Sequence, residues 1–422
     1  MADVFYSTRP AGAGSGNDLK VACNIVIASG VATFSAAQTG DIGVGCYVLS
    51  SNTDGYISEM TDSTHAKIIT ALGATHANVS SEALTSIYHP YASLSAAEAG
   101  SFDANHINEA DGDLRATTGA DVNLFWPCYG KTADTATFAL DSYIVDSTHF
   151  ITIYTPQGGA ESINNWRHSG KYNEALHHCT VGNGSFLTIH LAYTVIDGFQ
   201  FLHTYTGTSV NRYTITTGSA SPTGGTIRNC LVKGDGNGAQ QKGICKSYDC
   251  DSWVIENCIA YNLAVGISWG NNSGNATNIL INNCTTYNCT IGIYGSSASY
   301  RTYKTIIKNC VAFGCTTDFS GFYDSSSSNN ASEDGTAPGT SEVDLSGVLA
   351  SAIWTSASTG DFSIKDDDSV LYYAGTHISE LTTDIIGNPY HATTPSIGAF
   401  EYKTDAGGPV MPVFTYYHNQ AR

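Results

Sequence analysis

Acidic and basic residues in the middle of the chain are the ones most able to do chemistry. Asp249 and Asp251 flank one cysteine, so a strand would place both carboxylates on the same side. Paired carboxylates about 5–9 Å apart are what a glycoside hydrolase needs. Other acids and bases that a polysaccharide-cleaving site could use are Asp235, Glu256, Arg228, Lys233, Lys242 and Lys246. Turns between strands also collect solvated aspartates, and we favour that interpretation.

Metal and cofactor sites are not indicated by the remaining candidates. Five histidines gather in one stretch, without the spacing of a helical or strand metal site: His168, His177, His178, His190 and His203. Structural histidines are therefore the preferred interpretation. The segment Gly234-Asp-Gly-Asn-Gly238 resembles a calcium loop but lacks its further acids and bidentate glutamate. Trp253 and Trp269 could stack on sugars or belong to a core. We predict no catalytic residue, no metal site and no cofactor.

The charge balance excludes several classes of partner. The chain has 422 residues, with 18 Lys+Arg against 37 Asp+Glu and a formal charge of −19. A nucleic-acid binder needs a stripe of cations, and an anionic membrane surface repels an acidic chain. A hydrophobic content of 42% argues against a disordered polyanion. We therefore expect a folded protein without nucleic-acid or membrane partners.

The start of the sequence lacks the basic and apolar regions of a signal peptide. We therefore expect synthesis in a cytoplasm. The twelve cysteines are then expected to be thiols rather than a disulfide framework.

A repeat of about 26 residues runs through the second half of the chain. Four segments align, with steps of 28, 26 and 26 residues between their cysteines: Thr226-Ile-Arg-Asn-Cys230, Val254-Ile-Glu-Asn-Cys258, Leu280-Ile-Asn-Asn-Cys284 and Ile306-Ile-Lys-Asn-Cys310. An earlier copy, Val195-Ile-Asp-Gly198, fits with glycine at the cysteine position. Further columns recur at the same period, among them Leu263, Cys289 and Cys315. Several columns at one period indicate a repeat architecture.

The composition of each copy indicates strands and turns. Short runs of Ile, Val, Thr, Tyr and Phe are broken by Asn, Gly and Ser. Such a unit cannot bury its own apolar side, but stacked copies can, with strands about 4.8 Å apart. The sequence therefore predicts an all-β, right-handed parallel β-helix. We expect an asparagine ladder at Asn229, Asn257, Asn283 and Asn309, with an inward cysteine ladder beside it.

The rest of the chain divides around this repeat. Short alternating strands at ten-residue spacing predict a small antiparallel barrel or sandwich, and Ser93–Glu98 predicts a capping helix with Ser93 or Ser95 as its N-cap. The last residues contain an aromatic cluster that we predict to bind a partner: Phe414, Tyr416, Tyr417 and His418. The predicted parts are a first strand and turn (1–20), the barrel or sandwich (21–88), the β-helix with its helical cap (89–330), closing coils (331–402) and an extended arm (403–422).

In these features the chain resembles the right-handed parallel β-helix repeat proteins of phage and environmental genomes. The residues that carry the resemblance are the Ile/Val-x-Asn-Cys coils, the opening Asp3-Val-Phe-Tyr-Ser and the closing Thr383-Asp-Ile-Ile-Gly-Asn-Pro with Pro395-Ser-Ile-Gly-Ala-Phe-Glu-Tyr402. The resemblance covers most of the chain and is specific for the fold. The scaffold itself carries lyases, hydrolases, tailspikes and non-enzymatic virion proteins.

The resemblance implies a virion protein on the exterior of a tailed phage. Our leading expectation is a non-enzymatic head decoration (cement) protein that binds the major capsid protein or another virion protein, as a homotrimer by analogy with related spikes. One alternative is a tailspike-like depolymerase, a polysaccharide lyase or glycoside hydrolase. Another is an adhesin that holds a host surface glycan without cutting it.

Overall fold

The computed structural model describes residues 1–100, 107, 112–208, 210–220, 222–236, 239–247, 250–269, 278–297 and 305–402. The fold is all-β, with a parallel β-solenoid of about seven turns and a small closed six-stranded barrel, which confirms the predicted fold class. The predicted arm, 403–422, lies outside the described residues. Residues 1–167, 173–178 and 191–199 form one compact unit, and the remaining residues from 168 onward form the second.

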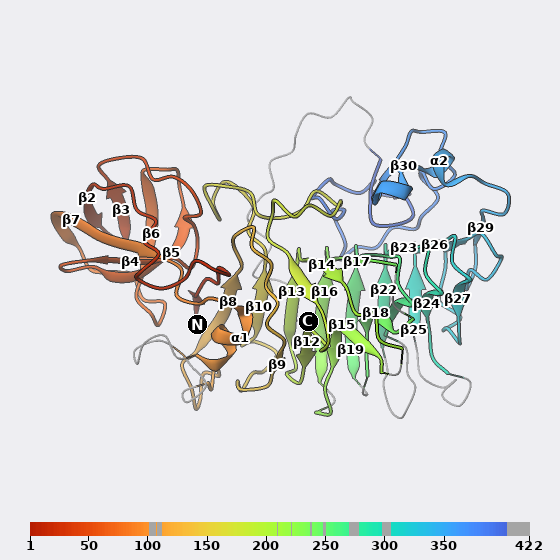
Figure 1. The fold of residues 1–422 in the computed structure, drawn as a ribbon, viewed down its shortest axis with the longest axis horizontal. Coiled ribbons are helices and arrows are strands. Elements are labelled where there is room, and N and C mark those ends of the chain that lie inside the picture. Colours follow the sequence, from red (N-terminus) through yellow and green to blue (C-terminus); the bar gives the residue numbers. More distant parts are fainter. Residues whose placement is uncertain are drawn as a thin grey trace. The chain divides into compact units, whose positions relative to one another are not determined.

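The barrel of the first unit is built by strands that alternate inward and outward residues. Its closed order is β2-β3-β6-β5-β4-β7 (Figure 1). In β2, Ile25 and Ile27 are buried while Val26 is exposed, as expected for a half-buried strand. The bounds are β2 Asn24–Ala28, β3 Val31–Phe34, β4 Tyr47–Ser50, β5 Asp54–Met60, β6 His65–Ile69 and β7 Val79–Tyr88. β7 is the longest strand of the barrel, with ten residues, and Asp54-Gly55 begins β5.

The barrel interrupts a parallel sheet of the same unit. The order of this sheet is β1 (Ala2–Phe5), β8 (Val122–Pro127), β10 (Ile151–Tyr154) and β13 (Thr194–Asp197). Strand β1 also contacts β5 of the barrel, and the Tyr6 hydroxyl donates to the Ala71 carbonyl. The barrel therefore lies against the first strand of the solenoid.

The earliest copy of the repeat needs one correction. Gly198 has a φ of 79° and is followed by Phe199, which is buried. In the later copies the residue with positive φ is the asparagine, and the buried residue after it is the cysteine. Gly198 therefore takes the asparagine position rather than the cysteine position, because glycine adopts this backbone conformation without strain.

The predicted helix is α1, Leu94–Ala99. The Ser93 hydroxyl accepts a hydrogen bond from the amide of Ala96 at 3.0 Å, so Ser93 is the N-cap. Gly100 ends the helix with a φ of 59°. Leu94 and Ala97 are buried, and α1 packs on β9 (Phe138–Leu140). Within the described residues no helix has the length and hydropathy of a membrane span.

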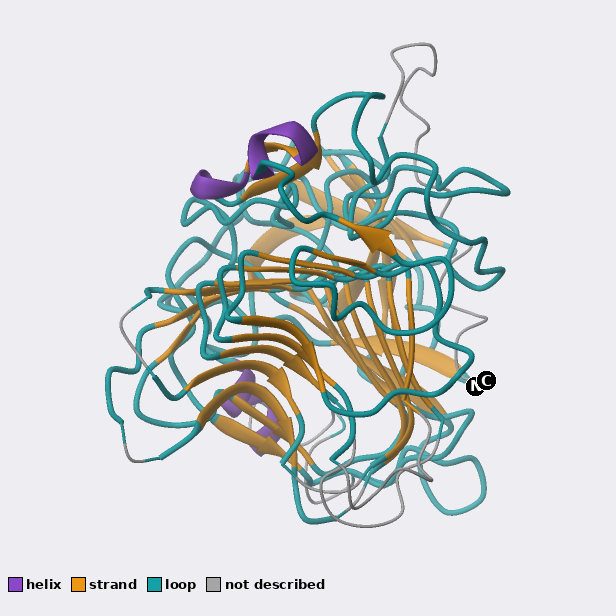
Figure 2. Ribbon diagram, turned by 90° about the vertical axis from the view of Figure 1, so that its right-hand side faces the viewer, coloured by secondary structure: helices purple, strands orange, loops and turns teal. Residues whose placement is uncertain are grey.

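The second unit consists of three parallel sheets whose strands stack turn on turn (Figures 1 and 2). The first sheet contains β16 Thr223–Arg228, β19 Asp251–Glu256, β22 Ile279–Asn282 and β25 Thr305–Lys308. The second contains β11 Cys179–Val181, β14 Gln200–His203, β17 Leu231–Gly234, β20 Ile259–Tyr261, β23 Thr285–Tyr287, β26 Val311–Phe313, β28 Ala331–Ser332 and β29 Val343–Asp344. The third contains β12 Leu187–Ile189, β15 Arg212–Thr217, β18 Gln241–Cys245, β21 Val265–Ser268, β24 Ile291–Tyr294 and β27 Thr317–Ser320.

The predicted asparagine ladder lies at the corner between the first and second sheets. Asn229, Asn257, Asn283 and Asn309 all have a φ near 50°. Asparagine tolerates this left-handed conformation better than most residues. The side-chain amide of Asn257 donates to the side-chain oxygen of Asn229 at 3.2 Å, and the side-chain amide of Asn309 donates to the side-chain oxygen of Asn283 at 3.1 Å. These bonds run along the axis and confirm the ladder.

The cysteines beside this ladder point inward. Cys230, Cys258, Cys284 and Cys310 are fully buried, and the amide of Cys284 lies 3.4 Å from the sulfur of Cys310. All twelve cysteines of the chain are free thiols in the structure, ten of them buried. The predicted role of the repeat cysteines in core packing is therefore confirmed.

The chain returns over the asparagine ladder in a segment that we call the closing strap, residues 371–402. Asn257 donates to the Thr383 carbonyl at 2.7 Å, and Asn329 to the Ala374 carbonyl at 2.9 Å. Asn309 donates to the Thr376 carbonyl and accepts from its amide, both at 2.8 Å. The ladder asparagines therefore bond both to each other and to the strap, which ties several turns together.

A small subdomain precedes the strap. Its elements are α2 Ala350–Ile353, β30 Trp354–Ser356, the 3-10 helix η3 Ala357–Thr359 and β31 Asp361–Ile364. Trp354 and Phe362 pack edge-to-face with ring centroids 5.5 Å apart, and both are buried. Tyr287 and Phe313 of the second sheet join this cluster, so the subdomain is anchored on the solenoid by aromatic contacts.

The last strand of the third sheet, β27, ends in side-chain caps. The amide of Asp318 donates to the Asp334 carboxylate at 3.0 Å, and the amide of Phe319 to the Thr336 hydroxyl at 2.9 Å. These acceptors replace the carbonyls that a further strand would offer. Unpaired edges are templates for aggregation, so the caps protect the end of the sheet.

The asparagine ladder gives the first testable prediction. Asn309→Gly keeps the left-handed backbone but removes three side-chain hydrogen bonds, so it should lower the free energy of unfolding by about 2–4 kcal/mol. Asn309→Ala should cost about 1–2 kcal/mol more, because alanine is strained in this conformation. Urea denaturation measures both. The control is Asn288→Gly: Asn288 is exposed and its side chain donates a hydrogen bond to Asn262, so the substitution should cost under about 1.5 kcal/mol. If Asn288→Gly and Asn309→Gly lowered the free energy of unfolding equally, the proposed role of Asn309 in tying the closing strap to the solenoid would be contradicted.

Candidate functional site

The predicted carboxylate pair is only partly within the described residues. Asp251 begins β19, where its amide donates to the Pro222 carbonyl, whereas Asp249 lies outside the described residues. Asp235 accepts a hydrogen bond from the Gln241 side chain at 2.6 Å. The glycine-rich segment that resembles a calcium loop also extends outside, since its residues 237–238 are not described.

Glu256 and Arg228 are neighbours on adjacent turns of the first sheet. The two residues are paired in register, and each side chain is about 6% exposed. Burial raises the pKa of Glu256, and the positive charge of Arg228 partly opposes that shift. Asn282 and Lys308 continue the same column. A buried carboxylate beside a buried guanidinium links two turns, which is a structural use of both groups.

The remaining predicted bases lie apart from this column. Lys233 lies over the Tyr172 ring, with 5.0 Å from its ammonium to the ring centroid. Lys246 is buried, and Lys242 belongs to β18 of the third sheet. Lys233 therefore lies on the second sheet and Lys242 on the third, whereas Arg228 and Glu256 lie on the first.

The predicted histidines each contact the backbone or pack locally. His168 contacts the Asn229 carbonyl at 2.9 Å, His177 the Tyr129 carbonyl at 3.1 Å and His203 the Arg212 carbonyl at 3.0 Å. Burial lowers the pKa of His177 to about 4 and also lowers that of His203. His178 contacts the Leu176 carbonyl, and the His190 ring packs against Gly218, in the space that a side chain there would need. These contacts confirm the structural interpretation for His168, His177, His178 and His203.

Trp253 and Trp269 belong to the core. Both are 0% exposed, and their ring centroids are 5.3 Å apart. The Trp253 indole donates to the Pro222 carbonyl at 3.0 Å. Neither ring is available to stack on a sugar. The aromatic residues predicted to bind a partner, Phe414, Tyr416, Tyr417 and His418, lie outside the described residues.

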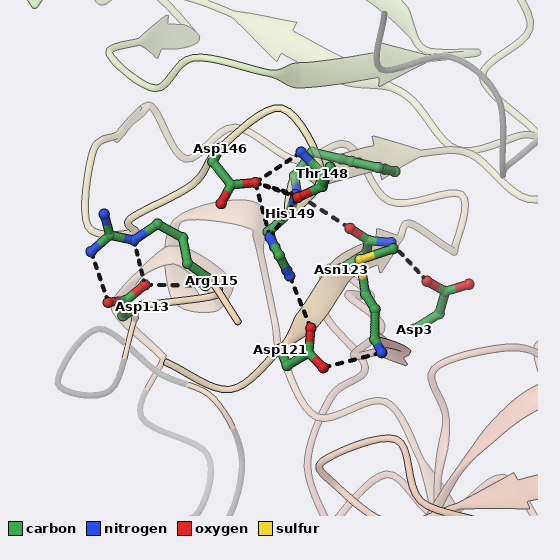
Figure 3. A network of polar contacts seen from close by, with 10 residues as sticks. Asp3, Asp113, Arg115, Asp121, Asn123, Asp146, Thr148 and His149 are labelled. Atoms are coloured by element: carbon green, nitrogen blue, oxygen red, sulfur yellow. Dashed lines mark hydrogen bonds and ion pairs between the residues drawn. The ribbon is translucent and has the colours of Figure 1, made fainter. Parts of the chain in front are cut away.

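A polar network that the sequence analysis missed lies in the first unit (Figure 3). His149 is at its centre, with one ring nitrogen 2.9 Å from Asp146 and the other 3.0 Å from Asp121. Asp121 also binds the amino group of Met1 at 3.1 Å. Beside this chain of charges, Asn123 donates to Asp3 at 3.0 Å. The network joins β1, β8 and the loop before β10 by charged hydrogen bonds.

The electrostatics of this network favour a positively charged His149. Its side chain is only 6% exposed, and burial alone would lower its pKa, but the bonds to Asp121 and Asp146 outweigh burial and raise it. The bond from His149 lowers the pKa of Asp121. Burial raises the pKa of Asp146, and the bonds from His149 and Thr148 more than reverse that shift. Because both imidazole nitrogens contact carboxylates, His149 serves as an ionic link rather than as a free general base.

The tetrapeptide that forms the network occurs twice in the chain. Asp146-Ser-Thr-His149 and Asp62-Ser-Thr-His65 have the same sequence and the same turn. In both, the aspartate accepts from the threonine amide and hydroxyl and contacts the histidine ring. Aspartate and threonine at these offsets form such turns readily. The repetition was visible in the sequence and is the signal that could have identified His149.

A second cluster of buried acids organises the closing strap. Asp384 is 1% exposed and accepts from the amides of Ile386, Asn388 and Glu401 at 2.7–3.1 Å. Glu401 accepts from the amide and hydroxyl of Ser396 at 2.9 and 2.6 Å. Burial raises the pKa of Asp384 to about 6 even though these donors oppose the shift, and burial also raises the pKa of Glu401. The carboxylates hold the folded path of the strap.

No group of three or more His, Cys, Asp or Glu side chains that could hold a metal ion occurs among the described residues. Comparisons of the chain with protein-family models, with curated proteins and with solved structures find no match.

The His149 link gives a prediction with a built-in control. His149→Gln should lower the free energy of unfolding by about 1–3 kcal/mol at pH 6, because it removes charged hydrogen bonds. The pKa of His149 is raised in the folded protein from 6.5, so this contribution is complete below pH 6.5 and is lost as the pH rises through the folded value. The loss should therefore be smaller at pH 9. Denaturant unfolding at the two pH values measures it.

His65→Gln is the matched control, since His65 has the same turn but a side chain 40% exposed. It should change the free energy of unfolding by less than about 0.5 kcal/mol. A loss at His149 that did not depend on pH would contradict the ionic link.

Asp384 gives a prediction of opposite pH dependence. Its pKa is raised from 3.8 to about 6 in the folded protein, so folding disfavours the ionised carboxylate above pH 6 and this cost disappears as the pH falls. Asp384→Asn cannot ionise but loses hydrogen-bond acceptors. Its destabilisation relative to the unmodified protein should therefore be larger at pH 5 than at pH 8, as measured by urea denaturation. A larger loss at pH 8 would contradict the raised pKa.

Proposed function

We propose that the protein is a non-enzymatic structural component on the exterior of a tailed-phage particle, and that it decorates and stabilises the head. The reason for proposing a phage particle is the resemblance of the coils and the closing segment to β-helix proteins of phage genomes. The major capsid protein, or another virion protein, is the proposed partner, and a homotrimer is the proposed state by analogy with related spikes.

The observation that carries the mechanical part of this proposal is the double use of the ladder asparagines. Asn257 and Asn309 each bond to the neighbouring turn and to the closing strap. A force that separates the turns must therefore break side-chain bonds in addition to the backbone ladder. Such bracing suits a protein that resists the internal pressure of a shell.

The use of the polar groups supports the same proposal. Described acids that a polysaccharide-cleaving site could employ have structural partners, such as Glu256 beside Arg228 and Asp235 beside Gln241. Asp384 and Glu401 bond to amides and a hydroxyl of the closing strap. These groups stabilise the scaffold, whereas a catalytic pair would converge on a site for substrate.

Locating the protein on native particles tests the proposal. Cryo-EM of the phage that encodes it should show many copies on the head, and particles without the protein should release DNA at a lower temperature. A few copies at the tail alone would contradict the decoration role. Cleavage of host polysaccharide by the purified protein, abolished in Asp251→Ala, would show an enzyme instead.

A further inference from the structure

Tyr373 in the closing strap combines an unfavourable backbone with an exposed ring. Its φ is 54°, and its side chain is 43% exposed. Of the fifteen described non-glycine residues with positive φ, eight are asparagine, and only Tyr193 and Tyr373 are aromatic. A bulky residue in this conformation is strained. Strained residues persist where the surrounding structure holds them, and they concentrate at functional sites.

The residues after Tyr373 explain how the strain is held. The Ala374 carbonyl accepts from Asn329 at 2.9 Å, and the Gly375 amide donates to the Pro395 carbonyl at 2.8 Å. Thr376 has two bonds to Asn309. These contacts fix the backbone but require no aromatic side chain. Asparagine or glycine would fit the same backbone with less strain, so the backbone contacts alone do not account for the tyrosine.

The ring of Tyr373 belongs to an exposed aromatic cluster, which we define as Tyr372, Tyr373, His391 and Tyr402. The Tyr372 and Tyr373 rings are stacked with centroids 3.8 Å apart, and His391 lies 4.4 Å from Tyr373. Tyr402 contacts Tyr372 edge-to-face at 5.2 Å. Tyr373 and His391 are exposed, so this cluster presents polarisable ring surface to solvent.

The surroundings of the aromatic cluster are strongly acidic. Residues 331–402 contain eleven acidic residues and a single lysine, Lys365. The segment therefore carries a large part of the chain's net charge of −19. Asp367 and Asp368 are exposed. A hydrogen bond with Tyr373 is the main cause that raises the pKa of Tyr372 to about 12, and the charges of Asp367 and Glu401 add to it. Asp367 and Glu401 therefore act on the Tyr372 hydroxyl, and Asp368 follows Asp367 directly in the chain.

We propose that the aromatic cluster, with Asp367 and Asp368, is a docking site for a basic segment of another protein. An arginine or lysine side chain lies against the exposed rings, whose faces attract cations, and neighbouring cations pair with the aspartates. Charge complementarity selects this partner, because the acids have almost no cation of their own in the segment. A neutral glycan would gain from the rings but not from this charge. The site does not depend on the proposed role in a phage particle.

Replacing the strained tyrosine separates binding from stability. The full chain is titrated at low salt into a fluorescent peptide of alternating arginine and glycine, and binding is followed by anisotropy. Tyr373→Asn should bind about threefold more weakly or worse, the size expected for loss of one exposed cation–π contact. Its melting temperature should change little, because the relief of backbone strain offsets the loss of the ring contacts with Tyr372 and His391. Tyr193→Asn is the matched control: it removes the other left-handed aromatic residue and should leave peptide binding unchanged.

A second pair of variants tests the charge without touching the backbone. Asp367→Asn with Asp368→Asn should weaken peptide binding and reduce its salt dependence. The control is Asp62→Asn with Glu59→Gln, which removes two exposed charges from the barrel and should have little effect on peptide binding. The proposal is overturned if the unmodified protein does not bind the peptide, or if Tyr373→Asn binds it equally well. It is also overturned if dextran displaces the peptide, since the cluster would then be a glycan site.

Discussion

A left-handed residue at the corner of each turn is the constraint on which the second unit depends. The chain must change direction there, and asparagine does so with little strain while its side chain remains free to bond. Asn257 and Asn309 use that freedom twice, once along the axis and once toward the closing strap. The same residue type therefore sets the corner, the register and the attachment of the strap. The inward cysteine that follows fits because a small apolar side chain fills the corner behind it.

The fold was predictable because this constraint repeats. Four Asn-Cys pairs at nearly constant spacing fix the phase of the turns, and alternation in segments such as Asn24–Ala28 predicts the barrel. Where the repeat changes chemistry, prediction failed: Gly198 replaces the asparagine rather than the cysteine. The path of the closing strap was not predictable either. Its bonds to Asn257 and Asn309 join residues more than sixty positions apart, and no local pattern encodes such pairs.

Candidate sites were harder to predict than the fold, because residue type does not reveal partners. Glu256 looked like a catalytic acid in the sequence, yet its environment is a buried guanidinium. His149 looked unremarkable, although two carboxylates contact it. The duplicated Asp-Ser-Thr-His turn was a usable local signal, but its second copy, at His65, is exposed. The tetrapeptide therefore predicts a turn, and only tertiary structure decides whether that turn becomes an ionic link.

The side-chain caps on β27 have a consequence for the length of the solenoid. Stacked strands can in principle add copies without limit, as amyloid does, because each new edge is a template for the next. Asp334 and Thr336 occupy the amides that a newcomer would need. The third sheet is therefore terminated by two short side chains, while the second sheet continues through β28 and β29. A lengthened version of this protein would have to gain its extra turns upstream of Asp318, leaving that terminator in place.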